Sequence, residues 1–163
     1  MALDTFMEAK KMEVLFVCTG NTCRSPMAEF LLRDKILKAG LNTAVTISSA
    51  GLAAVPGAVA SANAIAVLKD KGINANNHKA RLLNLELLKQ ADLVLTMTKY
   101  HKNDIIKAVP TFSHKVLTLG EFAESAVDVG DPFGGDETIY KNSCQQIATL
   151  LELAWPKILA MKS

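Results

Sequence analysis

The segment from Val14 to Pro26 constrains the fold most, because it places a cysteine between a short apolar run and the start of a helix. Cys18 and Arg24 bracket five residues, so the pattern is C-x5-R-S. The run that ends at Cys18 predicts a strand buried on both faces, as in a parallel sheet. Ser25 is expected as the N-cap and Pro26 as the first helical residue. A turn of this length before a helix N-terminus can wrap its backbone N–H groups around a tetrahedral anion.

Strands and helices are expected to alternate along the rest of the chain. We predict strands at 13–18, 43–48, 91–97 and 115–119, and helices at 26–39, 61–71, 85–90, 99–109 and 137–162. The last helix should present Ile147, Leu150, Leu151 and Leu153 to the core and should kink or end near Pro156. This order predicts an α/β fold, a three-layer α/β/α sandwich with a central four-stranded parallel sheet and a phosphate-binding loop after the first strand. Residues 1–12 are expected to be a short N-terminal extension and residues 13–163 a single domain.

Composition excludes several classes of function. The chain has 163 residues and a net charge of +2, which is too small to indicate nucleic-acid or membrane-surface binding. No apolar run approaches the roughly 20 residues that span a bilayer, and the first residues do not resemble a signal peptide. Three cysteines, an odd and low number, fit a reduced protein better than a disulfide scaffold. We therefore expect a cytoplasmic protein. We also expect it to be a monomer and, given the mechanism considered below, to need no cofactor and no metal.

The residues of the C-x5-R-S loop suit phosphoryl transfer. Cys18 would be the nucleophile, since thiolates are favoured at helix N-termini and beside cations. The planar guanidinium of Arg24 can grip two phosphate oxygens, and the hydroxyl of Ser25 can donate to the sulfur. Fixed N–H donors and one arginine are what the charge on the equatorial oxygens requires. Two other interpretations stay open: a cysteine that is only part of the core, and a loop that binds phosphate without reacting.

A cysteinyl-phosphate route also needs an acid for the leaving group and then a base for water. Asp131 is the leading candidate, because Pro132 and the two glycines that follow predict a sharp turn that would aim its carboxylate inward. Asp128 and Asp136 lie close by in the sequence and are separated from it only weakly. A plain surface turn is the alternative interpretation.

The stretch from Val14 to Glu29 resembles the signature of low-molecular-weight protein tyrosine phosphatases, and Asp131-Pro132 matches their acid-bearing turn. Further matches at 48–51, 78–81 and 91–97 and at Tyr140 extend the resemblance over about residues 13–155. The resemblance implies that Cys18 is the nucleophile, Arg24 the phosphate binder and Asp131 the general acid and base. It also implies a phosphate-binding loop formed by Thr19, Gly20, Asn21, Thr22, Cys23, Arg24 and Ser25. A hydrogen-bond network among Asn21, Ser25, Ser49 and His78 would hold this loop in shape, with His78 as a structural partner and not a metal ligand.

Two positions resemble the protein arginine phosphatase branch of this family, found in Gram-positive bacteria. Thr22 stands where tyrosine-directed members commonly carry an aliphatic residue. After the Asp-Pro, those members carry aromatic residues, often a tyrosine pair, whereas this chain has Phe133 followed by two glycines. A hydroxyl at position 22 should tolerate a polar phosphoguanidinium, and Phe133 would form an apolar wall. The expected partners are therefore proteins phosphorylated on arginine, and proteins phosphorylated on tyrosine are the alternative. Thr22 could also be a β-branched residue that only packs in the loop. Arsenate reduction is disfavoured, because no cysteine occurs between Cys23 and Cys144.

The two remaining cysteines have different expected roles. Cys23 lies in the same loop as Cys18 and could form a reversible disulfide with it under oxidation, or it could be inert. Cys144, on the last helix, is expected in the core.

Overall fold

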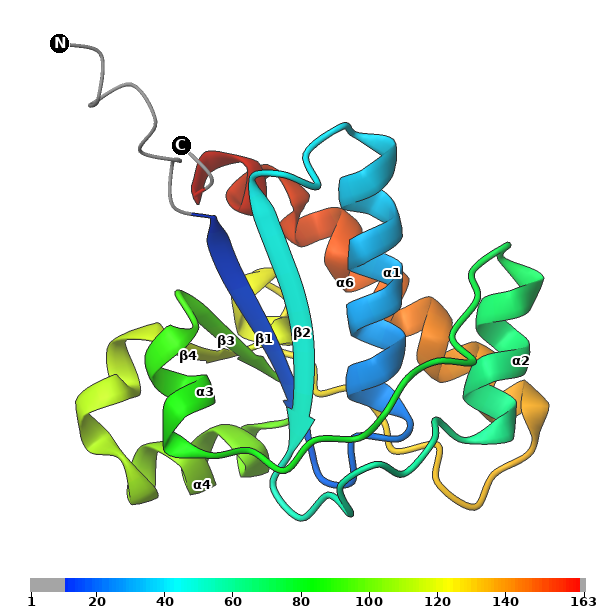
Figure 1. The fold of residues 1–163 in the computed structure, drawn as a ribbon, viewed down its shortest axis with the longest axis horizontal. Coiled ribbons are helices and arrows are strands. Elements are labelled where there is room, and N and C mark those ends of the chain that lie inside the picture. Colours follow the sequence, from blue (N-terminus) through cyan, green and yellow to red (C-terminus); the bar gives the residue numbers. More distant parts are fainter. Residues whose placement is uncertain (1–10, 162–163) are drawn as a thin grey trace, which may run out of the picture.

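The computed structural model describes residues 11–161 and has a four-stranded parallel sheet at its centre (Figure 1). The strands are β1 (Met12–Cys18), β2 (Val45–Gly51), β3 (Leu93–Thr96) and β4 (Val116–Thr118), in the order β2-β1-β3-β4. The predicted α/β sandwich with a parallel sheet is confirmed. Of the expected N-terminal extension, residues 1–10 lie outside the described residues, and Met12 already belongs to β1.

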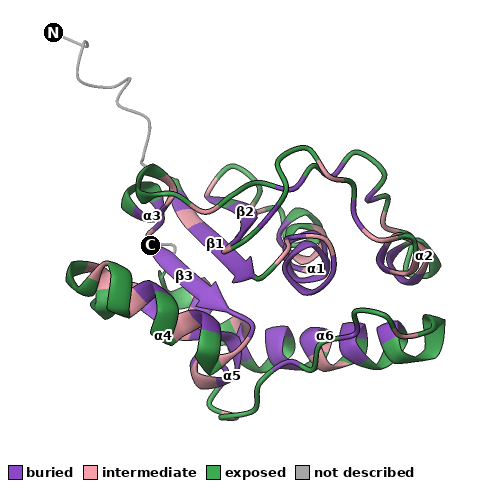
Figure 2. Cartoon of the chain, turned by 90° about the horizontal axis from the view of Figure 1, so that it is seen from below, coloured by how far each residue is buried: buried purple, intermediate pink, exposed green. Residues whose placement is uncertain are grey.

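Helices cover both faces of the sheet. One face carries α1 (Arg24–Lys38), α2 (Ala62–Asp70), α5 (Leu119–Phe122) and α6 (Glu137–Met161). The other carries α3 (Leu85–Gln90) and α4 (Lys99–Ala108), which runs into a short 3-10 helix, η2 (Pro110–Lys115). Figure 2 shows buried residues lining the inward sides of α1, α4 and α6. Within residues 11–161, no helix combines the length and apolarity that crossing a bilayer requires.

The side chains of β1 alternate between the two layers. Val14, Phe16 and Cys18 belong to the core that faces α1 and α6, whereas Leu15 and Val17 pack toward α3 and α4. All five are at most 3% exposed. A strand buried on both faces reads as a continuous apolar run because each face needs its own apolar side chains, which is why the sequence pattern identified it. Cys18, the last residue of β1, therefore points toward the layer that contains α1.

The last helix differs from the expectation in two ways. It continues through Pro156 to Met161, so an end near Pro156 is wrong, and the alternative of a kink there stays a prediction. Proline removes the bond to the carbonyl four residues earlier, but both Pro156 and Glu152 are exposed, so water can satisfy that carbonyl. Leu153 is 56% exposed, and Ala154 takes its place in the core, because helical spacing from Ile147 places 150, 151, 154 and 158 on one face. Cys144 is buried in this core, as predicted.

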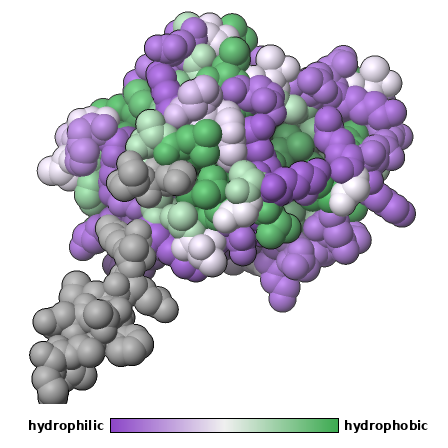
Figure 3. Space-filling view, turned by 90° about the horizontal axis from the view of Figure 1, so that it is seen from above, coloured by the Kyte–Doolittle hydropathy of each residue, from purple (hydrophilic) through white to green (hydrophobic). Residues whose placement is uncertain are grey.

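The carboxyl ends of the strands form the edge where ligands bind in open α/β sheets. Figure 2 views the molecule from this end, and the loops after β1 and β2 meet there. The predicted long segment 120–135 starts with α5, which a Thr118–Glu121 capping box holds, and then returns to this edge, where the Val129 N–H donates to the Met97 carbonyl (2.9 Å). Figure 3 views the opposite end of the molecule, where hydrophobic residues near the centre are framed by hydrophilic ones.

Candidate active site

The loop between β1 and α1 is shorter than predicted, because the helix begins earlier. Helix α1 already begins at Arg24, and its N-cap is Cys23, which makes no side-chain capping bond. The expectation that Ser25 caps the helix is therefore wrong, because its hydroxyl faces inward to the Cys18 sulfur. Asn21 has φ 56°, a left-handed conformation that Asn tolerates better than most residues. This turn brings the Asn21 N–H to 3.3 Å from the sulfur of Cys18.

A chain of hydrogen bonds runs from a buried carboxylate to the cysteine. The Ser49 hydroxyl donates to Glu29 (2.5 Å), the Asn21 side-chain amide donates to both Ser49 and Ser25 (2.8 Å each), and Ser25 Oγ lies 2.9 Å from Cys18 Sγ. The carboxylate can only accept, so the direction of the Ser49 bond is fixed. Because Ser25 accepts from Asn21, its own proton is free to be donated to the sulfur. Such a donor stabilises a thiolate.

Two further contacts hold Asn21 in the orientation that this chain needs. The Arg81 backbone N–H donates to Asn21 Oδ1 (2.9 Å), which settles which end of the amide carries the NH₂ group. His78 Nε2 lies 2.8 Å from the Asn21 carbonyl oxygen, and His78 is buried. The structure therefore brings together Asn21, Ser25, Ser49 and His78 as the predicted network. It adds Glu29, which itself pairs with Arg33.

Arg24 connects this loop to the acidic segment. Its Nη1 donates to the carbonyl of Val129 (3.2 Å), and its Nη2 lies 3.5 Å from Asp131 Oδ2. The guanidinium is buried, and its Nε has no hydrogen-bond partner among the described residues. A buried donor without a partner is costly unless a ligand satisfies it. Arg24 thus offers an N–H group to whatever occupies the adjacent cavity.

The three candidate acids have distinct positions. Asp128 accepts from the Lys99 N–H at the start of α4 (3.1 Å), and Asp136 accepts from the Ile139 N–H at the start of α6 (3.0 Å). Both are used to satisfy helix N-termini. Asp131 instead accepts from the Phe133 N–H (3.1 Å), which forms the predicted turn, and its carboxylate reaches Arg24. Asp131 is the one of the three that lines the cavity at Cys18.

This cavity has a volume of about 250 Å³. Its walls combine the nucleophile candidate, the loop, the arginine and the acid turn, namely Cys18, Thr19, Gly20, Thr22, Cys23, Arg24, Asp131 and Phe133. Cys18 is only 3% exposed, whereas Phe133 is 79% exposed, so the cavity narrows from an aromatic rim to a sulfur at its base. The structure therefore assembles the predicted site residues from two segments more than 100 residues apart.

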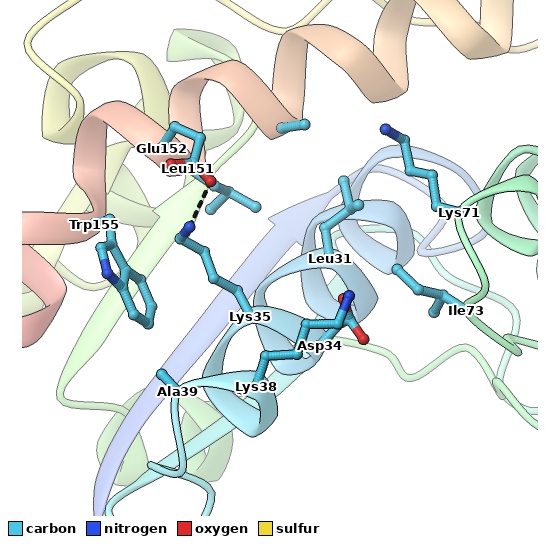
Figure 4. A pocket seen from close by; sticks show the side chains of 11 residues that line it. Leu31, Asp34, Lys35, Lys38, Ala39, Lys71, Ile73, Leu151, Glu152 and Trp155 are labelled. Carbon is cyan, nitrogen blue, oxygen red and sulfur yellow. Dashed lines mark hydrogen bonds and ion pairs between the residues drawn. The ribbon is translucent and has the colours of Figure 1, made fainter.

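A larger cavity of about 520 Å³ lies between α1 and α6 and holds none of these groups (Figure 4). Its walls come from the C-terminal half of α1, from α6, and from Lys71 and Ile73 after α2. Lys35 of α1 donates to Glu152 (2.5 Å) and lies over the ring of Trp155. It contains lysines but no cysteine or histidine. Among residues 11–161, no group of three His, Cys, Asp or Glu side chains could hold a metal ion.

Cys23 has hydrogen-bond partners outside the loop. Its sulfur lies 3.2 Å from the Tyr140 hydroxyl and 3.6 Å from Ser61 Oγ. Burial, followed by the hydrogen bond to Cys23, raises the pKa of Tyr140. All three cysteines are free thiols in the structure, so the predicted Cys18–Cys23 disulfide stays a prediction.

Sequence reasoning missed His101, in the first turn of α4. This side chain is 2% exposed and lies 2.9 Å from Thr19 Oγ1, so it reaches the loop from the opposite face of the sheet. Burial, and next the positive charge of Arg24, lower its pKa from 6.5 to about 4. His101 follows shortly after the end of β3, and that position could have identified it as a candidate site residue. Glu29 was missed too, although a carboxylate among the apolar residues of α1 indicates a buried partner.

The family model described as low molecular weight phosphotyrosine protein phosphatase matches residues 13–161 of the chain. A protein-arginine-phosphatase of Bacillus subtilis is 45% identical over 141 residues, 86% of this chain and 92% of that protein. A probable low molecular weight protein-tyrosine-phosphatase of Ralstonia nicotianae is 33% identical, covering 91% and 97%. The solved structure of an arginine phosphatase from Geobacillus stearothermophilus superimposes with a TM-score of 0.85 at 39% identity, covering 93% of this chain and 95% of that one.

Proposed function

The chain belongs to the low-molecular-weight phosphotyrosine protein phosphatase family, and we propose that it removes phosphate from arginine side chains of proteins through a cysteinyl-phosphate intermediate. The observation that carries this proposal is the cavity that combines Cys18, Arg24 and Asp131 with Thr22 and Phe133. The first three supply the reaction, and the last two supply the choice of substrate.

In the first step, the Cys18 thiolate attacks phosphorus and the bond from phosphorus to the guanidino nitrogen breaks. Asp131, as the neutral acid, donates its proton to that nitrogen, so arginine leaves with its guanidinium group restored. Arg24 and the loop N–H groups bind the equatorial oxygens, where the charge spreads in the transition state. The unpartnered Nε of Arg24 supports this role.

In the second step, the Asp131 carboxylate takes a proton from water as the oxygen attacks the phosphocysteine. The sulfur–phosphorus bond breaks, phosphate is released, and Cys18 leaves as a thiolate. The Ser25 hydroxyl, 2.9 Å from the sulfur, stabilises that leaving thiolate. Every proton is accounted for between Asp131, water and the substrate nitrogen.

Arginine specificity rests on Thr22 and the acid turn. Thr22 is half-buried and lines the cavity, so it lies beside a ligand that enters. A phosphoguanidinium has N–H groups that can donate to the Thr22 hydroxyl oxygen and to the Asp131 carboxyl oxygen that carries no proton, whereas the phenyl ring of phosphotyrosine offers no such donor. A substrate that leaves polar groups of the site without hydrogen-bond partners loses more binding free energy than one that lacks a methylene group in an apolar pocket.

The test compares turnover of a phosphoarginine protein with that of a phosphotyrosine peptide. We expect the wild-type protein to prefer phosphoarginine and Thr22→Ile to shift the ratio toward phosphotyrosine. Thr22→Ser, which keeps the hydroxyl, is the matched control and should keep the preference. Equal or faster wild-type turnover of phosphotyrosine would sink the arginine specificity but leave the phosphatase activity standing.

A non-catalytic phosphate-binding module is excluded by a simpler assay. Hydrolysis of p-nitrophenyl phosphate by the wild-type protein, and its loss in Cys18→Ser, distinguishes an enzyme from a binding protein. We further propose that the protein acts as a cytoplasmic monomer, since three free cysteines suit a reducing compartment and one chain supplies the whole cavity. Light scattering after size exclusion tests the oligomeric state.

A further inference from the structure

His101 reaches the cavity through one hydroxyl group. Its Nε2 lies 2.9 Å from Thr19 Oγ1, and its Nδ1 lies 3.0 Å from Thr98 Oγ1. Thr98 is the N-cap of α4, and its oxygen also accepts from the His101 backbone N–H (3.3 Å). The ring thus joins a helix cap on one side of the sheet to the residue that follows Cys18.

The hydrogen-bond directions in this chain can be assigned. Burial and the nearby Arg24 keep the imidazole neutral, so one ring nitrogen donates and the other accepts. The Thr98 oxygen already accepts from a backbone N–H, and no other acceptor of residues 11–161 contacts its hydroxyl, so its proton goes to Nδ1. The ring proton is then on Nε2 and is donated to Thr19. In the opposite tautomer the Thr98 hydroxyl proton would have no acceptor among residues 11–161.

The Thr19 hydroxyl is left with one proton of its own. Since its oxygen accepts from the ring, this proton cannot be donated to His101. Thr19 is exposed and lines the cavity, directly after Cys18 in the chain. Arg24 and Asp131 line the same cavity as Thr19, so the Thr19 hydroxyl shares that cavity with the guanidinium and the acid.

We propose that His101 is a positioning residue that holds the Thr19 hydroxyl as a hydrogen-bond donor toward the phosphoryl group in the cavity. The proposal rests on the phosphatase function proposed above, and it deepens that function by adding a side-chain donor to the backbone donors of the loop. Because His101 is neutral, the loop gains an oriented hydrogen-bond donor without a second buried cation. A second cation beside Arg24 would raise the free-energy cost of burying the Arg24 guanidinium.

The test is a double-mutant cycle of Thr19→Val and His101→Leu, read out as kcat/KM on p-nitrophenyl phosphate and as affinity for inorganic phosphate. Loss of one directed hydroxyl should lower both quantities roughly tenfold. His101→Leu should cause a similar loss, and the double variant should lose no more than either single one. Thr19→Ser should stay within about twofold of wild type, and His101→Gln, whose amide can still donate to Thr19, should recover most of the activity.

Several outcomes would overturn the proposal. One is Thr19→Val within about twofold of wild type; another is a double variant whose losses multiply, which would mean that the residues act independently. If His101→Leu fails to fold, the comparison of Thr19→Val with Thr19→Ser decides alone, since position 19 is exposed. Phosphate affinity does not require turnover, so a protein that binds phosphate through Thr19 but cleaves no ester would refute the proposed function and not this inference. His114→Leu, at an exposed histidine of η2, is the control and should leave both quantities unchanged.

Discussion

The buried histidine makes the stability of the fold sensitive to mild acid. The pKa of His101 is lowered from 6.5 to about 4, first by burial and next by Arg24, while Asp128, Asp131 and Asp104 oppose the shift. Between these two pH values the unfolded chain binds a proton that the folded chain does not. The free energy of unfolding must therefore fall as the pH is lowered through this window.

The size of the effect follows from the two pKa values. Between pH 7 and pH 5, the linkage relation gives a loss of about 2 kcal/mol from this one group, and at most about 3 kcal/mol at still lower pH. Other groups also titrate in this range, so the wild-type profile alone does not isolate His101. The quantity to measure is the difference between the wild type and His101→Gln, which has no ring to protonate.

Urea unfolding near pH 7 and near pH 5 provides this measurement. We expect His101→Gln to lose less stability than the wild type across this interval, by about 2 kcal/mol, whatever its stability at neutral pH. His114→Gln, at an exposed position, should follow the wild-type profile. Parallel profiles for the wild type and His101→Gln would refute the assignment of a neutral buried imidazole at this position.

Two further variants test how the cavity is held. Gly51→Ala should abolish activity and lower the melting temperature. A Cβ atom there would lie 2.5 Å from the Thr19 carbonyl oxygen and 2.9 Å from the Asn21 nitrogen, and these backbone atoms cannot move without disturbing the loop. The control is Gly57→Ala, where φ is +85° but no atom lies within 4 Å, and it should keep full activity. Gln146→Ala should lower kcat roughly tenfold on phosphoarginine, because its side chain bonds both the Asp128 carbonyl (2.9 Å) and the Gly130 N–H (3.2 Å) and so holds the segment before Asp131. An unchanged kcat in Gln146→Ala would show that the acid turn is held by other contacts, and Gln145→Ala on the exposed face is its control.

The parts of the site that could be predicted are those whose chemistry is local. Cys18 and Arg24 are joined by one short loop, so their spacing in the sequence predicts that both line one cavity, as they do in the structure. The second strand was predicted to end at Ser48, but it runs to Gly51, because the ladder continues until Cys18 pairs with Gly51. Nothing in the short-range pattern distinguishes a strand residue from the small residues after it when the partner strand decides the length.

The parts that could not be predicted depend on which helices the sheet brings together. Glu29 and Ser49 are 20 residues apart, His101 and Thr19 are 82 apart, and Gln146 reaches a loop 16 to 18 residues upstream. The first two of these contacts follow from the strand order β2-β1-β3-β4, which places β1 between β2 and β3, and the third follows from how α6 packs beside the segment that precedes it. A polar residue inside an apolar helical stretch signals that a partner exists, but its identity is set by the tertiary fold.

The loop after β1 is held from both layers of the sandwich. On the α1 side, Glu29 fixes the direction of the hydrogen bonds through Ser49 and Asn21 to Ser25, whose own proton is then free for the Cys18 sulfur. On the α4 side, His101 contacts Thr19. Donors that are already oriented when the substrate arrives need no reorganisation during the reaction, which is the main source of electrostatic stabilisation in enzymes. Removing the Ser49 hydroxyl, which interrupts these hydrogen bonds, should therefore lower kcat more than it raises KM, although Ser49 does not line the cavity.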